Sequence, residues 1–221
     1  MLGTYEITVG SNPAIRTLKN ITKGLKHMKN RKWNIINKDE NPMHVVVFVA
    51  RNKDNKHIEN HKERRKAFIT KDPIDSDYLR EKFKIFVNQG QPGETSRMYY
   101  SVNSRNEQLV YEELLHFLIA NKDFNLCSLK SKLAGLAAKK ENSLSKKWMF
   151  DFDIDDHDKV LEFCKDITDS DKNEETTIYK TPNGYAVITS RGFDTRTLLN
   201  KWNTNVTLKR DDLLCYMWAT K

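Results

Sequence analysis

The sequence predicts an α+β fold, and three observations lead to that class. The last 75 residues, 147–221, show strand and helix patterns in the order β-α-β-β-α-β. Residues 44–50 (His-Val-Val-Val-Phe-Val-Ala) form an apolar run typical of a buried strand. The chain is 38% hydrophobic and 31% charged, which is typical of a globular protein. We expect residues 1–94 to be an N-terminal α/β portion that completes one domain with a core of residues 95–221, because no linker in that half resembles a domain boundary.

The first half predicts helices on either side of the apolar strand. A helix is expected over residues 12–29, where apolar residues recur at helical spacing behind a polar cap: Ile15, Leu18, Ile21, Leu25 and Met28 after Ser11 or Asn12. Residues 51–72 resemble an exposed loop or a polar helix. A short helix begins at Ser76 or Asp77 and runs through residue 86, and Gln-Gly-Gln-Pro-Gly at 89–93 then breaks the chain.

The middle of the chain predicts one strand and two helices. Residues 97–105 form the strand, with polar groups spaced along it. Strong helical patterns follow over residues 109–120 and 126–139, and residues 141–145 are expected to be a linker.

The last third gives the clearest pattern. The expected elements are a strand at 148–153, a helix at 157–168, strands at 176–181 and 185–190 around a Pro-Asn-Gly turn, a helix at 194–203, and one long strand at 206–218. This order is that of a ferredoxin-like unit. Its sheet is antiparallel, both helices cover one face, and the first strand lies between the third and the fourth. We expect the other face to be open.

Carboxylates stand on the first of these strands, where alternate side chains point to opposite faces. Trp148, Phe150, Phe152 and Ile154 share one face; Met149, Asp151, Asp153 and Asp155 share the other. Close like charges repel, and a divalent cation satisfies them. The pattern predicts a metal site, with Mg²⁺ or Mn²⁺ as cofactor. The alternative is an acidic strand end that leads into a helix, with Asp155 or Asp156 as its N-cap.

The same alternation on the last strand predicts a third carboxylate. With Val206 and Leu208 in the core, Thr207, Lys209 and Asp211 face the open side. The topology places this strand beside the first one. We therefore expect Asp151, Asp153 and Asp211 to be the metal ligands and catalytic acids.

The motifs on this unit resemble those of the archaeo-eukaryotic primase (primase-polymerase) superfamily, over about residues 95–221. Phe150-Asp151-Phe152-Asp153 is similar to the family's apolar strand ending in Asp-x-Asp, and the stretch 206–212 to its strand with one acidic residue. The resemblance implies an RRM-like core and metal-dependent nucleotidyl transfer. One departure matters: the family's motif-two histidine, which contacts the phosphates of the incoming nucleotide, is replaced here by Ala186 in Gly184-Tyr-Ala-Val-Ile. Alanine can neither donate a hydrogen bond nor carry charge.

Cationic, amide and aromatic residues near the acids predict a nucleotide or nucleic-acid site, because such groups contact phosphates and bases. The candidates are Arg97, Tyr99, Asn103, Arg105, Lys180, Asn183, Arg191 and Lys209. The alternatives are an edge strand ending in a polar turn for the first four, and surface residues without a specific role for the others.

Charge and cysteine content set the remaining expectations. The net charge is +8, with a basic stretch at residues 51–66 and an acidic one at 151–175, which favours a polyanionic partner. Cys127, Cys164 and Cys215 are expected to be buried free thiols rather than zinc ligands or a disulfide. His57 and His61 lie among basic residues, which argues against a metal site there.

These observations predict a primase-type nucleotidyltransferase that acts on nucleoside triphosphates and nucleic acid. Its activity is altered or lost if Ala186 stands in the site. The alternatives are a non-catalytic nucleic-acid-binding module and a metal-dependent nuclease. No apolar run reaches the roughly 20 residues of a membrane helix, and no P-loop or Rossmann glycine motif is present. We expect a cytoplasmic protein, in the host cytoplasm if it is of viral or mobile-element origin, as the small size and lack of a zinc motif indicate.

Overall fold

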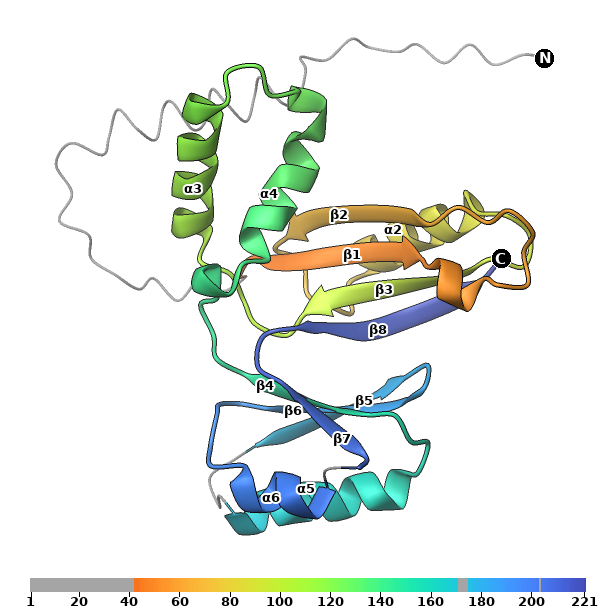
Figure 1. Ribbon diagram of the computed structural model, residues 1–221, viewed down its shortest axis with the longest axis vertical. Coiled ribbons are helices and arrows are strands. Elements are labelled where there is room, and N and C mark those ends of the chain that lie inside the picture. Colours follow the sequence, from red (N-terminus) through yellow and green to blue (C-terminus); the bar gives the residue numbers. More distant parts are fainter. Residues whose placement is uncertain (1–41, 171–174, 203) are drawn as a thin grey trace, which may run out of the picture. The chain divides into compact units, whose positions relative to one another are not determined.

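In the computed structural model, residues 42–170, 175–202 and 204–221 are described, and they form two antiparallel four-stranded sheets with helices (Figure 1). The predicted helix at 12–29 lies outside these residues. The α+β class is confirmed. Within the described part, residues 42–124 and 130–221 belong to one unit that contains both sheets.

The first sheet has the strand order β2-β1-β3-β8. Its strands are β1 (His44–Ala50), β2 (Arg64–Thr70), β3 (Thr95–Ser101) and β8 (Leu213–Thr220). Helix α2 (Asp77–Asn88) begins after Ser76, whose hydroxyl accepts a hydrogen bond from the Leu79 backbone N–H at 3.3 Å. Helix α2 thus begins where the sequence predicts.

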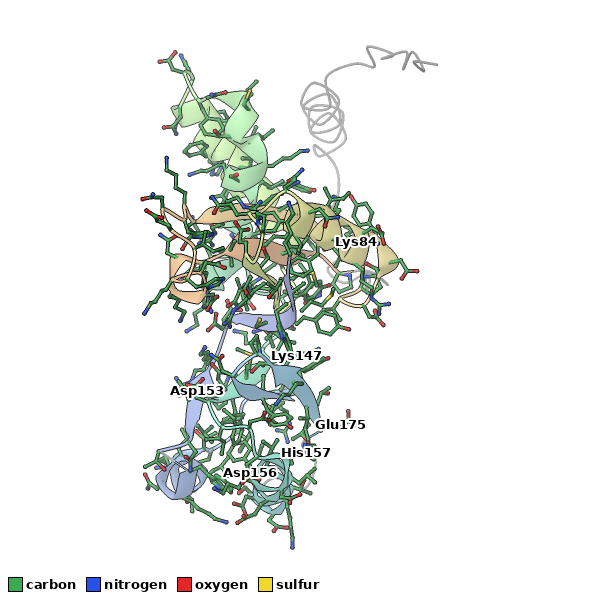
Figure 2. All side chains as sticks on the ribbon, turned by 90° about the vertical axis from the view of Figure 1, so that its right-hand side faces the viewer. Lys84, Lys147, Asp153, Asp156, His157 and Glu175 are labelled. Carbon is green, nitrogen blue, oxygen red and sulfur yellow. The ribbon has the colours of Figure 1, made fainter. Side chains whose placement is uncertain are left out.

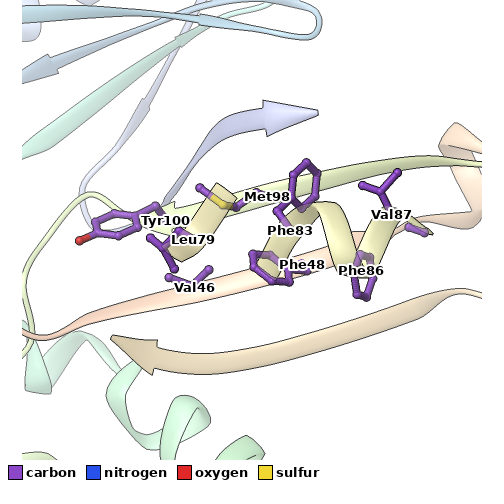
Figure 3. Packing of buried hydrophobic residues seen from close by; sticks show 9 residues of the cluster. Val46, Phe48, Leu79, Phe83, Phe86, Val87, Met98 and Tyr100 are labelled. Atoms are coloured by element: carbon purple, nitrogen blue, oxygen red, sulfur yellow. The ribbon is translucent and has the colours of Figure 1, made fainter. Parts of the chain in front are cut away.

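One face of the first sheet packs on α2. Figure 3 shows this core, in which β1, α2 and β3 contribute the buried side chains Val46, Phe48, Leu79, Phe83, Phe86, Val87, Met98 and Tyr100. Alternate residues of β1 and β3 therefore point away from α2, toward the other face of the sheet. Those residues include Val47, Val49, Arg97 and Tyr99.

The second sheet has the order β5-β6-β4-β7. Its strands are β4 (Trp148–Phe152), β5 (Thr176–Thr181), β6 (Gly184–Thr189) and β7 (Val206–Lys209). As predicted, β4 lies between β6 and β7. Helices α5 (His157–Ser170) and α6 (Arg196–Trp202) share one face of this sheet, where Phe150 and Phe152 pack in a buried aromatic core (Figure 1).

The connecting segment between the sheets carries α3 (Glu107–Ala120), η3 (Leu126–Ser128), α4 (Leu129–Ala137) and η4 (Lys140–Asn142). The 3₁₀ turn η2 (Asn52–Asp54) follows β1. Both predicted helices are present. The predicted linker at 141–145 is instead partly ordered, since Asn142 is buried and Ser143 forms a β-bridge with Arg105.

Two predictions of secondary structure are wrong. Residues 64–70 form the edge strand β2 rather than a loop or polar helix. The expected long strand at 206–218 is two strands, β7 and β8, which belong to different sheets. Three residues, 210–212, separate them, and the chain crosses there from one sheet to the other.

The predicted open face of the second sheet is largely covered. Met149 and Ala186 on that face join a buried cluster with Val102 and Leu214 of the first-sheet side. Ala186 is 1% exposed. The apolar residues on this face thus lie against the first sheet, whereas Asp151 is partly exposed and Asp153 is exposed.

The cysteines differ in part from expectation. All three are free thiols, as predicted, but Cys127 is exposed and only Cys215 is buried. None of the described helices is long and apolar enough to cross a membrane.

His44 in the first sheet gives a pH prediction. Burial lowers the pKa of His44 from 6.5 to about 4, although its ring Nδ1 lies 2.9 Å from the Ser101 carbonyl oxygen. The unfolded chain therefore takes up a proton at a higher pH than the folded one. The contribution of His44 to the free energy of unfolding is intact above pH 6.5. It falls by up to about 3 kcal/mol as the pH decreases toward 4.

Urea unfolding at pH 7 and pH 4.5 measures this loss. The His44→Gln variant should lose less stability between the two pH values than the unmodified protein. His116→Gln, at an exposed histidine of α3, is the control and should keep the unmodified slope. An unchanged slope in His44→Gln would contradict the assignment.

Candidate active site

A cavity of about 470 Å³ lies between the inner faces of the two sheets. Strands β1, β2, β3 and β8 provide one wall, and β4, β6, β7 and the β5–β6 hairpin provide the other. Charged side chains of both signs line it. Asp151, Asp153, Asp212 and Lys209 come from the second-sheet side, and Arg51, Lys53, Glu63, Arg65 and Arg97 from the first-sheet side.

The carboxylates reach the cavity through the alternation predicted for β4. Asp151 lies opposite Ala186 of β6 and Thr207 of β7, so these three residues share the cavity face. Asp153 follows the end of β4 and also lines the cavity. Figure 2 labels Asp153 together with Asp156 and His157 of the same segment. Ala186 is thus the direct neighbour of Asp151 across the β4–β6 pair.

The acidic run divides into two roles. Asp151 and Asp153 line the cavity, whereas Asp156 caps α5 by accepting the Lys159 backbone N–H at 3.2 Å. Asp155 is exposed and forms an ion pair with Lys180. The N-cap prediction is therefore confirmed for Asp156, and the metal site at Asp151 and Asp153 stays a prediction.

Lys209 bridges two carboxylates at the cavity wall. Its Nζ lies 2.8 Å from Asp151 Oδ2 and 3.5 Å from Asp212 Oδ2. Burial would lower the pKa of Lys209, but the hydrogen bond to Asp151 and the charges of both acids outweigh burial and raise it. The ammonium is therefore charged and occupies the position between two acids that a cation would favour.

Asp211 does not join this set. Its carboxylate accepts hydrogen bonds from Arg105 Nη1 at 2.9 Å and from Asn103 Nδ2 at 3.2 Å, in a buried ion pair. Asp212 lines the cavity in its place. The alternation that predicted Asp211 ends with β7 at Lys209, and the bend that follows reverses the direction of the next side chains.

Asn103 and Arg105 hold the sheets together rather than line the cavity. The Asn103 amide donates to the carbonyl oxygen of Lys147 at 3.0 Å, and its side-chain oxygen accepts the Lys147 backbone N–H at 2.7 Å. These bonds fix the start of β4 to the end of β3. Neither Asn103 nor Arg105 lines the cavity with the other predicted binding residues.

The other predicted binding residues are split between the cavity and its surroundings. Arg97, Tyr99, Asn183 and Lys209 line the cavity. Lys180 pairs with Asp155 and its ammonium lies 4.3 Å from the Tyr185 ring centroid, outside the lining. Arg191 is also outside the lining, and its carbonyl accepts a hydrogen bond from Thr189 at 3.0 Å.

Sequence reasoning missed Arg51 and Arg65 as individual site residues. The basic stretch at 51–66 was the available signal, but only the pairing of β2 with β1 shows which of its side chains face the cavity. Arg65 lies opposite Val49, and Arg97 lies opposite Val49 on the other side. The neighbour Lys66 lies opposite Phe48 on the α2 side.

The donor set fits a divalent cation that arrives with phosphate groups. In the described part of the chain, no three His, Cys, Asp or Glu side chains lie close enough to hold a metal ion. Mg²⁺, however, is usually bound by one or two carboxylates together with substrate phosphates. Asp151, Asp153 and Asp212 line one cavity and are carboxylates of that kind.

Comparisons with protein-family models, with curated proteins and with solved structures find no match to this chain. The functional proposal below therefore rests on the fold and the cavity.

Proposed function

We propose that this chain binds a nucleoside triphosphate and a divalent cation in the cavity between its sheets, as a primase-type nucleotidyltransferase that acts on nucleic acid. The observation that carries the proposal is the cavity itself. Three carboxylates stand on one side of it and four cationic side chains on the other, in a space of about 470 Å³. Pockets of roughly 300–1,000 Å³ suit small-molecule ligands.

The fold supports the same proposal. The order β5-β6-β4-β7, with α5 and α6 on one face, is the arrangement expected of an RRM-like unit. The Asp-x-Asp segment ends its central strand and faces the cavity.

A bound Mg²⁺ or Mn²⁺ would supply positive charge that stabilises the triphosphate and the leaving pyrophosphate. Asp151 and Asp153 would hold the cation, with Asp212 beside them. Lys209, now paired with Asp151, would be released to contact phosphate oxygens. Met149 and Ala186 pack in a buried apolar cluster, which excludes water from the part of the cavity next to Asp151.

The residue at position 186 determines whether the site catalyses nucleotide incorporation. A histidine there would stand directly across from Asp151 and could donate to a phosphate, which alanine cannot do. We expect weak or no turnover in the unmodified protein and higher turnover in the Ala186→His variant.

The test is incorporation of labelled nucleotides with Mn²⁺ and single-stranded DNA or RNA. Asp151→Asn in the Ala186→His background should lower incorporation by about 10²–10³-fold, the usual cost of losing an electrostatic catalytic group. Asp155→Asn, four residues farther along the acidic run and paired with Lys180 outside the cavity, is the matched control and should leave incorporation unchanged.

Other outcomes would contradict the proposal. If Asp151→Asn incorporated nucleotides as well as the Ala186→His parent does, Asp151 would not be part of the catalytic site. Strand shortening without nucleotides would indicate a nuclease. Strand binding with no turnover in any folded variant, Ala186→His included, would indicate a non-catalytic binding module.

A further inference from the structure

Three arginines form one wall of the cavity, which we call the arginine wall: Arg51, Arg65 and Arg97. Arg65 of β2 and Arg97 of β3 flank Val49 of β1 in register, on the face of the sheet opposite α2. Arg51 follows the last residue of β1. Three adjacent segments thus present guanidinium groups to the same cavity.

Two residues of the arginine wall, Arg51 and Arg97, are held in position by one acid. Asp54 Oδ1 accepts from Arg97 Nη2 at 2.8 Å, and Asp54 Oδ2 accepts from Arg51 Nε at 2.7 Å. Burial would raise the pKa of Asp54, but the hydrogen bonds and charges of both arginines outweigh burial and lower it, so the carboxylate is charged. One negative charge is therefore shared by two guanidinium groups, and the pair keeps a net positive charge.

The turn that carries Asp54 is itself anchored. The Asn55 side chain is fully buried, donates to the carbonyl oxygens of Arg51 and Thr95 at 2.9 Å each, and accepts the Thr95 backbone N–H at 2.6 Å. This bonding ties the turn to β3. The guanidinium groups consequently need little reordering when a ligand binds.

Arg97 also has unused hydrogen-bonding capacity. Its residue is 9% exposed, and its Nε is buried without a hydrogen-bond partner. A buried unpaired donor is costly, and a charged group more so. An anionic ligand in the cavity would supply the missing acceptor.

We propose that the arginine wall binds the phosphate chain of the ligand, on the side of the cavity opposite the carboxylates. Guanidinium forks match phosphate oxygens in geometry and charge. Of the charged residues that line the first-sheet side, four are cationic and Glu63 alone is acidic. The carboxylates across the cavity repel phosphate, which also directs the chain to the arginines. The identity of the ligand as a nucleotide rests on the proposed function, but the binding of phosphate does not.

Inorganic tripolyphosphate is the probe, measured by calorimetry at constant ionic strength with EDTA present, so that no metal contributes. Arg65→Met should weaken binding by about 10–100-fold, the equivalent of one charged hydrogen bond. Lys66→Met is the matched control. It removes the same charge from the adjacent residue of the same strand, but on the α2 side, and should bind as tightly as the unmodified protein.

A second variant tests the geometry of the site. Arg97→Lys keeps the charge but loses the planar fork, and it should weaken tripolyphosphate binding as well. If this variant fails to fold, Arg65→Met still decides, because Arg65 is exposed and its loss leaves the Asp54 network intact.

The possible outcomes separate this proposal from the enzymatic one. Equal binding by Arg65→Met and the unmodified protein, or no binding by either, would overturn it. Displacement of tripolyphosphate by an oligonucleotide without terminal phosphates would assign the wall to a strand backbone and would also overturn it. Binding through Arg65 without nucleotide incorporation in any variant would refute the proposed function and leave the phosphate site standing.

Discussion

The Arg105→Ala variant is expected to lose about 3–5 kcal/mol of unfolding free energy, because it leaves a buried carboxylate without its partner. Arg105 is 3% exposed, and its Nη1 lies 2.9 Å from Asp211 Oδ2. Among the residues that the structure describes, Asn103 alone still donates a hydrogen bond to Asp211 when Arg105 is lost. Denaturant unfolding followed by circular dichroism measures the change.

An exposed ion pair serves as control. Arg196 and Asp194 form a pair of similar bonding but in solvent, so Arg196→Ala should leave the unfolding midpoint unchanged. Replacing both buried partners at once, as Arg105→Met with Asp211→Leu, should recover much of the stability, since no unpaired charge remains. A small loss in Arg105→Ala would mean that Asp211 reaches solvent or other partners, and would return it to the candidates for the active site.

The same experiment distinguishes a structural acid from a functional one. Asp151→Asn and Asp212→Asn alter residues at the cavity wall, and we expect much smaller stability changes there than at Asp211. Asp151 and Asp211 were predicted to act together because side-chain alternation along their two strands placed both on the open face of the sheet. The structure shows that one of them lines the cavity while the other joins β3 to the bend before β8.

What the sequence predicts well here depends on local periodicity. The aromatic and acidic residues of β4 alternate with a period of two, and the structure places them on opposite faces as that period requires. The β5–β6 hairpin follows from its Pro-Asn-Gly turn in the same way. These features need no information from distant parts of the chain.

What the sequence does not predict depends on long-range pairing. Arg210-Asp211-Asp212 marks a strand end only weakly, because its two aspartates disfavour a strand but neither glycine nor proline is present and apolar residues resume at Leu213. The exchange between sheets is set by the pairing of β8 with β3, more than 100 residues earlier. Likewise, β2 is an edge strand with charged residues on both faces, and its pairing with β1 determines that Arg65 enters the cavity.

Gly184→Ala is expected to cost about 1–3 kcal/mol of stability through overpacking. A Cβ at Gly184 would clash with the Phe152 carbonyl oxygen and would lie 2.7 Å from that of Ile154. Both contacts are with backbone atoms, which cannot move away by a change of rotamer as a flexible side chain can. The strand end must therefore move, or β6 must separate from β4.

Gly135→Ala is the matched control, with the opposite sign. Gly135 lies within α4, and its Cβ would meet nothing within 4 Å. Alanine there should raise the free energy of unfolding by about 0.5–1 kcal/mol, the helix-propensity difference. A comparison of the two variants by thermal and denaturant unfolding separates the loss of glycine as such from the clash at β4.

The clash at Gly184 also bears on the site, because Phe152 and Ile154 flank Asp153. Any shift that relieves the contact with their backbone moves the carboxylate that lies between them, as well as the hairpin residues at 181–183 that line the cavity. We therefore expect Gly184→Ala to abolish nucleotide incorporation in the Ala186→His background while tripolyphosphate still binds the arginine wall, which belongs to the other sheet. Loss of both properties in a folded variant would show that the two walls of the cavity do not act independently.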